Sequence, residues 1–207
     1  MAEKMGLPRP VSVQNPYNLL VRKDTEGGMV EAVSPRNLNV SFLAYSPLAG
    51  GALTGKYLNP KKIKDTYRMR RYVGYMHRYI SPPAMAATKR YQEIADSLVV
   101  PLTPMALAWV YSRPFVTSTV IGATDLKQLD DNVHSLNMLL SEEALSLINE
   151  AYKLHLDPTK GSFPVVDPYL DDMDPSMLPW GARDIDVDPE LDMLINYRLA
   201  STLPPKS

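Results

Sequence analysis

The sequence contains no cysteine, which excludes a disulfide framework, a thiolate metal site and a cysteine nucleophile. The absence is compatible with a reducing compartment. Histidine is also scarce, and His77, His134 and His155 lie far apart without the spacing of metal ligands. We therefore expect no metal site.

Neither sign of charge is in excess, because 22 Lys and Arg residues stand against 23 Asp and Glu residues, for a formal net charge of -1. No field of the whole protein then favours nucleic acid, a membrane surface or an acidic partner. No apolar run approaches the roughly 20 residues of a membrane span, and the start "MAEKMGLPRP" lacks the apolar core of a secretory signal. We expect a cytoplasmic protein without a membrane partner.

The composition is otherwise globular, with 45% hydrophobic residues in 207, a length suited to one domain. Three short β-rich or apolar runs predict strands, at 11–14, 40–45 and 118–122. The first should be halted by Asn15 and Pro16. The second is almost continuously apolar, as expected of a strand buried on both faces of a parallel sheet.

Helical periodicity occurs between and after these runs. The predicted helices span 28–33, 84–99, 103–113, 125–136 and a stretch that begins at Ser141. Thr103 is expected to cap the third of them, with Pro104 at its first position. Strands separated by helices indicate β/α units, and thus an α/β fold with a parallel sheet.

Two stretches depart from this pattern. Between Lys56 and Arg78 lie eight Lys or Arg residues and one Asp, and the interleaved aromatic residues are Tyr57, Tyr67, Tyr72 and Tyr75. Such a mixture could bind RNA by stacking and charge neutralisation, but we favour a solvated loop whose tyrosines pack on the domain edge. We call residues 56–79 the basic segment. The second stretch is the Pro- and Asp-rich extension 156–207, which we expect to be extended or disordered.

The segment "FLAYSPLAGGALTGKYL", residues 42–58, turns from a strand into glycines and a lone lysine. In a parallel sheet, ligands collect where strands end, and the stretch 45–55 follows such an end. Gly50, Gly51 and Gly55 permit backbone geometry that lets amides approach an anion, while Lys56 adds a cation. Taken alone, the same glycines are also explained by a tight turn.

A second strand end stands in "VIGATDLKQLDDNVHSL", residues 120–136. Thr124 and Asp125 can cap the following helix, whose first amides can meet a phosphate. A buried apolar stripe is expected from Leu126, Leu129, Val133 and Leu136. The opposite face carries Gln128, Asp131 and Asn132, which suit contacts with an adenine or a ribose.

These residues resemble the aldo-keto reductases. "QNPYNLLVR", "AYSPLAGGALTGKYL" and "VIGATDLKQLDDNVHSL" are similar to the sixth strand, the seventh strand with its loop, and the eighth strand with its helix in that family. The similarity is greatest to the branch with the bacterial Tas protein and the potassium-channel beta subunits, and it covers about residues 1–155. It implies the C-terminal part of a (β/α)8 TIM barrel, strands 6 to 8 with their helices, that binds NADP(H) across the strand ends.

The resemblance also implies roles for individual residues. Gln14 would hold the nicotinamide carboxamide, and Tyr45 would stack on the nicotinamide ring. The pyrophosphate would be surrounded by Ser46, Pro47, Leu48, Gly50, Leu53 and Lys56. The adenosine end would be held by Gly122, Thr124, Gln128, Asp131 and Asn132.

The catalytic tetrad of Asp, Tyr, Lys and His in this family belongs to the first half of the barrel, which this sequence does not match. No catalytic residue is therefore assigned, and we expect the chain alone not to reduce carbonyls. Three interpretations stay open: an incomplete NADP(H)-dependent reductase, a non-catalytic accessory or regulatory subunit, and RNA binding through the basic segment. A protein partner could complete the barrel, and a carbonyl substrate would bind only with the missing half supplied.

Overall fold

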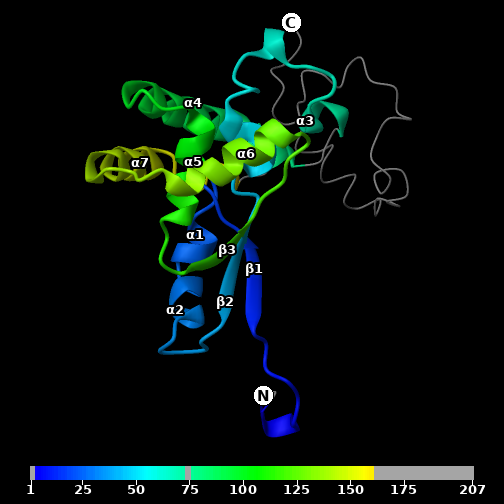
Figure 1. The fold of residues 1–207 in the computed structure, drawn as a ribbon, viewed down its shortest axis with the longest axis vertical. Helices are drawn as coiled ribbons and strands as arrows, with labels where there is room; N and C mark the ends of the chain where they lie inside the picture. The colour runs from blue at the N-terminus through cyan, green and yellow to red at the C-terminus, as the bar shows by residue number, and fades with distance from the viewer. Residues whose placement is uncertain (1–2, 73–75, 161–207) are drawn as a thin grey trace, which may run out of the picture.

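A computed structural model of the chain describes residues 3–72 and 76–160. The predictions made for Tyr75 and for the extension from residue 161 onward concern residues outside this part. The fold is α/β around a three-stranded parallel sheet (Figure 1). Its strands are β1 (Ser12–Pro16), β2 (Ser41–Tyr45) and β3 (Val116–Val120), in that order across the sheet. A partial barrel is consistent with this arrangement.

Two of the predicted strand boundaries were wrong. β1 is not halted at Asn15, since it continues to Pro16, which pairs with Tyr45 of β2. Proline is tolerated there because β1 is an outer strand of this sheet, and the missing N–H removes no bond to β2. β3 begins at Val116 rather than at 118 and ends where Val120 pairs with Tyr45.

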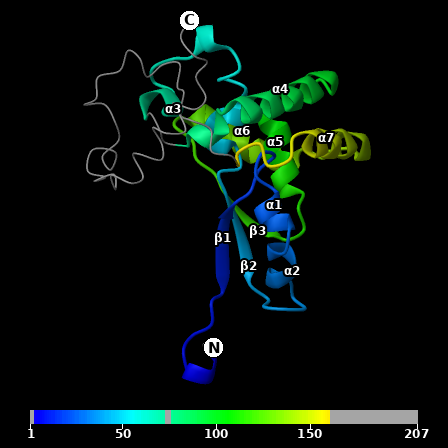
Figure 2. The same ribbon diagram turned by 180° about the vertical axis from the view of Figure 1, so that it is seen from behind.

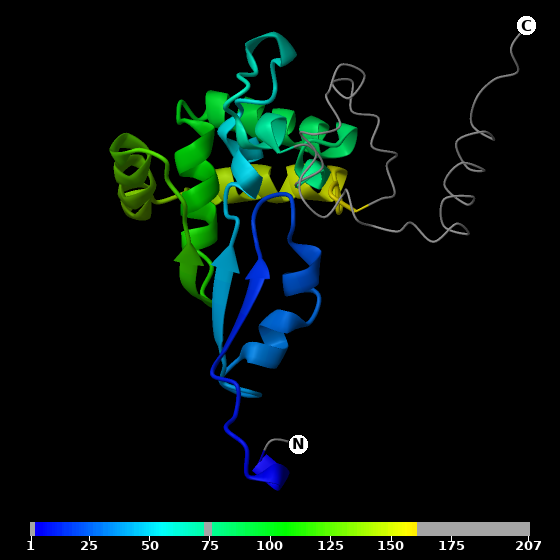
Figure 3. The same ribbon diagram turned by 90° about the vertical axis from the view of Figure 1, so that its right-hand side faces the viewer.

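Helices connect and follow the strands. α1 (Lys23–Glu26) and α2 (Met29–Val33) join β1 to β2 and lie beside the sheet (Figure 2). α3 (Arg68–Arg71), α4 (Pro82–Ser97) and α5 (Leu102–Tyr111) lie between β2 and β3. α6 (Leu126–His134) and α7 (Glu142–Leu154) follow β3. The three arrows in Figure 3 point toward the end of the molecule where α4 to α7 gather.

The core forms between β2 and α5. Phe42 and Ala44 of β2 are fully buried, as is Trp109 of α5. The Tyr17 ring stacks on Trp109 with centroids 5.1 Å apart and meets Phe42 edge-on at 6.2 Å. A helix that is apolar on nearly every side, as α5 is, needs such burial to be stable.

Only one face of β2 is fully buried, contrary to the expectation of two buried faces. Leu43 and Tyr45 on the other face are half-buried, and the sheet register places exposed Gln14 and Ser118 beside Leu43. The described elements therefore pack against one side of the sheet and leave the other partly open.

The start of α5 also differs from the prediction. Thr103 does not cap it, because the helix begins at Leu102 and Pro101 occupies the cap position without a side-chain bond. Pro104 is tolerated within the first turn, where its N–H would have no partner inside the helix. In the described residues no single helix is long and apolar enough to cross a membrane; α4 and α5 meet that test only as a pair, bent by 97°.

Arg22 joins α1, α5 and α7. Its guanidinium donates to both carboxylate oxygens of Glu26, at 2.9 and 3.1 Å, and to Asn149 of α7 at 3.1 Å. It also lies over the rings of Trp109 and Tyr152, 4.8 and 4.1 Å from their centroids. A buried cation is tolerated here because its donors and its planar face are satisfied.

The predicted burial of the α6 stripe was wrong. Leu126, Leu129, Val133 and Leu136 are 84%, 44%, 46% and 57% exposed, whereas Asn132 is 3% exposed. The reason is that α6 packs through the face of buried Asn132, whose backbone carbonyl accepts from the Tyr111 hydroxyl of α5 at 3.3 Å. The apolar stripe is therefore turned away from α5.

Candidate functional site

The sheet brings the two sequence motifs to one edge. β2 and β3 are parallel neighbours, and Tyr45 at the end of β2 pairs with Val120 at the end of β3. The chain segments that follow these residues therefore leave the sheet side by side, as expected for a ligand site at the strand ends. Gln14 lies on neighbouring β1, paired with Leu43.

The turn after β2 contains several left-handed residues. Ala49, Gly50 and Gly51 follow one another with φ of 50°, 63° and 99°, and Gly55 has φ of 75°. Glycine is needed most at Gly51, because its φ of 99° lies far from the value of about 57° at which other residues adopt the left-handed conformation. The expectation that these glycines provide special backbone geometry is confirmed.

Ser46 begins this turn with φ of 53°, and its carbonyl accepts a 2.9 Å bond from the amide of buried Asn18. The side-chain oxygen of Asn18 accepts bonds from the backbone N–H groups of Leu20 and Val21. Asn18 thus fixes the turn to the segment after β1. Asn18 was not among the predicted site residues, although its place just beyond a predicted strand end was an available signal.

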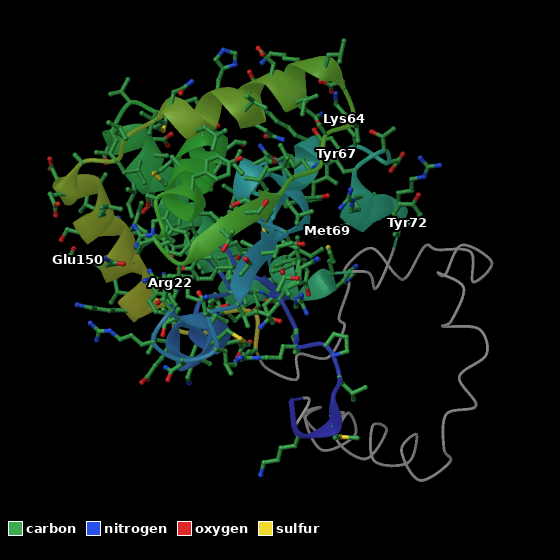
Figure 4. All side chains as sticks on the ribbon, turned by 60° about the horizontal axis from the view of Figure 1, so that its bottom comes forward. Arg22, Lys64, Tyr67, Met69, Tyr72 and Glu150 are labelled. Atoms are coloured by element: carbon green, nitrogen blue, oxygen red, sulfur yellow. The ribbon has the colours of Figure 1, made fainter. Side chains whose placement is uncertain are left out.

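The basic segment packs directly on the glycines. A Cβ atom added to Gly50 would lie 2.9 Å from both Met69 Cε and Met76 Sδ, and one added to Gly51 would lie 2.9 Å from Lys56 Cε and Nζ. The glycines therefore admit side chains of the basic segment at close range. The segment folds back over the turn; Figure 4 labels four of its residues.

Lys56 is held within this packing. Its ammonium lies 5.3 Å from the Tyr57 ring centroid and 4.8 Å from that of Tyr67. Burial lowers the pKa of Lys56, and the charge of Arg68 lowers it further. None of the ion pairs formed by the described residues includes Lys56. A partly desolvated cation without a carboxylate is suited to bind an anion.

Arg78, at the other end of the basic segment, reaches the strand tip. Its guanidinium donates to the hydroxyl of buried Tyr79 at 3.2 Å, and its charge interacts with nearby Tyr45. A second cation therefore lies near the ring that the resemblance assigns to the nicotinamide. Arg78 was part of the predicted basic segment but had no predicted role.

Not every predicted residue has an accessible side chain. Leu53 is fully buried in the core and Pro47 is buried as well, so neither side chain is exposed to a ligand. Ser46, Leu48 and Gly50 are half-buried. Gln14 is exposed on the open face of the sheet.

The start of α6 forms a polar network. Asp125 caps the helix by accepting from the Gln128 N–H at 2.9 Å, and its second oxygen accepts from the Gln128 side-chain amide at 2.7 Å. The Gln128 carbonyl oxygen in turn accepts from the N–H and the hydroxyl of Thr124, both at 3.1 Å. Thr124 and Gln128 are exposed, so this network is open to exchange partners with a ligand.

Asn132 and Asp131 differ in their surroundings. Asn132 is buried and donates to the Gly122 carbonyl at 3.4 Å, which ties the helix to the loop before it. Asp131 is exposed and pairs with Lys127 at 2.6 Å. Of the predicted adenosine-site residues, Asn132 therefore has the most evident structural role.

Comparison with known proteins agrees with this geometry. Residues 1–153 match the Aldo/keto reductase family. The chain is 47% identical to the "Aldo-keto reductase" of Babesia bovis over 65% of this chain and 47% of that protein. It is 39% identical to "Protein tas" of Escherichia coli K12, over 76% and 44% of the two chains.

A third relative is the "Probable voltage-gated potassium channel subunit beta" of Arabidopsis thaliana, 29% identical over 67% of this chain and 42% of that protein. The chain thus spans less than half the length of these three relatives. The resemblance read from the three motifs is confirmed. The chain belongs to the aldo-keto reductase family.

Proposed function

We propose that this chain provides the dinucleotide-binding part of an NADP(H)-dependent aldo-keto reductase. The observation that carries the proposal is the pairing of Tyr45 with Val120. It brings the turn after β2, residues 46–55, which we call the glycine turn, and the start of α6 to one sheet edge. The family generally uses NADP(H), whose pyrophosphate needs cations and backbone amides at such an edge.

The cations near the turn fit this cofactor. Lys56 lies over Gly51 without a carboxylate partner in the described residues and would bind the pyrophosphate. Tyr45 would face the nicotinamide, with the positive charge of Arg78 nearby. When bound, the nicotinamide supplies the hydride for carbonyl reduction. The polar network of Thr124 and Gln128 would hold the adenosine end.

A proton donor for the developing alkoxide is the component that we do not assign to this chain. Tyr17 is fully buried and its hydroxyl donates to Glu26 at 2.7 Å, and burial raises its pKa far above the usual range. Tyr57 is also buried, and its hydroxyl accepts from the Met69 N–H at 3.2 Å. Neither hydroxyl is placed to protonate a substrate, so we propose that the chain alone is inactive with aldehydes.

A protein surface that completes the barrel is part of the proposal. β1 and β3 are the outer strands of the described sheet, and the Leu126 to Leu136 stripe of α6 is exposed. Unpaired edges next to exposed leucines favour association with another surface. The Arabidopsis relative bears the name of a channel subunit, which favours a regulatory assembly as the second candidate function.

RNA binding is not favoured, because Tyr57, Tyr67 and Tyr72 of the basic segment have intramolecular contacts. Tyr57 is buried, Tyr67 contacts Lys56, and Tyr72 lies under Arg71 with the guanidinium 5.7 Å from the ring centroid. The Tyr57 and Tyr67 rings are therefore poorly available for stacking on bases.

NADPH fluorescence titration of the 207-residue chain tests the proposal. Lys56→Met should weaken NADPH binding at least tenfold, because a charge-assisted contact is lost. Lys89→Met, on the exposed side of α4, is the matched control and should leave the affinity unchanged. Absence of NADPH binding by the unaltered chain, or equal affinity of the two variants, would contradict the assignment.

A further inference from the structure

We infer that Tyr67 is a positioning residue that holds the Lys56 ammonium over the glycine turn for contact with the cofactor phosphates. The inference rests on the proposed NADP(H) site and adds a residue to it. No sequence motif pointed to Tyr67, which the sequence analysis placed among tyrosines packing on the domain edge.

The Lys56 ammonium lies beside two tyrosine rings and the glycine backbone. The ammonium lies 4.8 Å from the Tyr67 centroid, closer than to Tyr57, and both distances are within the range of a cation–π contact. The third side is Gly51, where an added Cβ would meet the same ammonium at 2.9 Å. Tyr67 therefore contacts the same ammonium that lies over Gly51.

Tyr67 is itself fixed by the chain around it. Its ring meets the Tyr57 ring edge-on with centroids 5.8 Å apart, and its N–H donates to the Lys64 carbonyl at 2.9 Å. Tyr67 stands at the cap position of α3, and the Tyr57 hydroxyl accepts from Met69 in the first turn of that helix. The two tyrosines are thus joined both by their rings and through α3.

Lys56 needs such support because its environment otherwise favours release into solvent. Burial and the nearby charge of Arg68 both disfavour the protonated side chain in this position. A lysine side chain has four rotatable bonds and loses much conformational freedom when it is fixed. With the Tyr67 ring removed, the ammonium should move outward. NADPH should then bind more weakly, because the ammonium must be brought back to the turn on binding.

Tyr67 and Tyr72 form a matched pair for a test. Both belong to the basic segment, and each ring lies beside a basic side chain, Lys56 for Tyr67 and Arg71 for Tyr72. Tyr72 is 48% exposed, and its ring partner has no contact with the glycine turn among those described. Loss of the Tyr72 ring should therefore change the surface without moving Lys56.

The experiment is NADPH fluorescence titration of the 207-residue chain and its variants. Tyr67→Leu should weaken binding about fivefold, the change expected when a partly desolvated cation–π contact is lost. Tyr67→Phe keeps the ring and should bind as the unaltered chain does, and Tyr72→Leu should have no effect. In a Lys56→Met background, Tyr67→Leu should have no further effect, because no ammonium remains to be positioned.

These outcomes separate a positioning role from a structural one. Weakening by Tyr67→Leu of the same size in both backgrounds would overturn the inference, because the ring would then act independently of Lys56. If Tyr67→Leu alone binds NADPH as tightly as the unaltered chain does, the inference is overturned as well. The proposed function would stand in that case, because the chain would still bind NADPH. If the unaltered chain binds no NADPH, the proposed function fails, and the inference that rests on it fails too.

Discussion

Replacing Gly51 with alanine should destabilise the chain by about 1–2 kcal/mol. Gly51 has φ of 99° and ψ of 1°, a left-handed conformation that costs an L-residue roughly 1–3 kcal/mol. The new Cβ would also lie 2.9 Å from Lys56 Cε and Nζ, which can move because they are the free end of a flexible side chain. The lower entropy of alanine in the unfolded chain offsets about 0.4–1 kcal/mol of this cost.

The assay is equilibrium urea unfolding followed by circular dichroism, with Gly122→Ala as the matched control. Gly122 has no left-handed φ, and an added Cβ would meet nothing within 4 Å, so that variant should be neutral or slightly stabilised. Gly51→Ala should in addition weaken NADPH binding, because the Cβ displaces the ammonium of Lys56. Equal unfolding free energies for the two alanine variants would refute the reasoning.

Three further predictions concern the core, the exposed stripe and the charge of the site. Arg22→Met should lower the unfolding free energy by about 1.5–3 kcal/mol in urea, because the bonds from a buried guanidinium to Glu26 and Asn149 are lost. Arg90→Met, in an exposed pair, should change it by less than about 0.5 kcal/mol. Replacing both Leu126 and Leu136 with lysine should reduce self-association of the chain in size-exclusion chromatography. Elution of the unaltered chain as a 23.1 kDa monomer would count against an association surface on α6. Burial and a neighbouring arginine lower the pKa of Lys56, so between that pKa and the usual 10.5 the unfolded chain binds more protons at this site than the folded chain. The unfolding free energy should therefore rise with pH in this range. Lys56→Met should reduce the slope of this rise, measured by urea titrations at several pH values.

The elements with clear periodicity could be predicted from the sequence. The apolar run before Tyr45 forms β2, and the spacing of Tyr91, Ile94 and Ala95 correctly predicted the buried side of α4. Ser141 caps α7 by accepting from the Ala144 N–H at 3.1 Å. These features depend on residues close together in the chain, so local pattern is enough to identify them.

The apolar stripe of α6 shows what the local sequence pattern cannot predict. Periodicity correctly placed Leu129 and Val133 on one apolar face, but it cannot tell which face a neighbouring helix covers. That choice depends on the contact between α5 and Asn132, residues distant in sequence. The same limit applies to Lys56, because its position over Gly51 depends on the return of Tyr67 from a later part of the basic segment.

Hydrogen–deuterium exchange of the 207-residue chain with and without NADPH tests the central claim most directly. The account holds that the glycine turn and the start of α6 form one dinucleotide site at the edge where Tyr45 pairs with Val120. NADPH should then slow amide exchange in both 46–56 and 122–132, and Lys56→Met should diminish the protection in both at a fixed NADPH concentration. Protection confined to one of these stretches, or found only elsewhere in the chain, would contradict the claim.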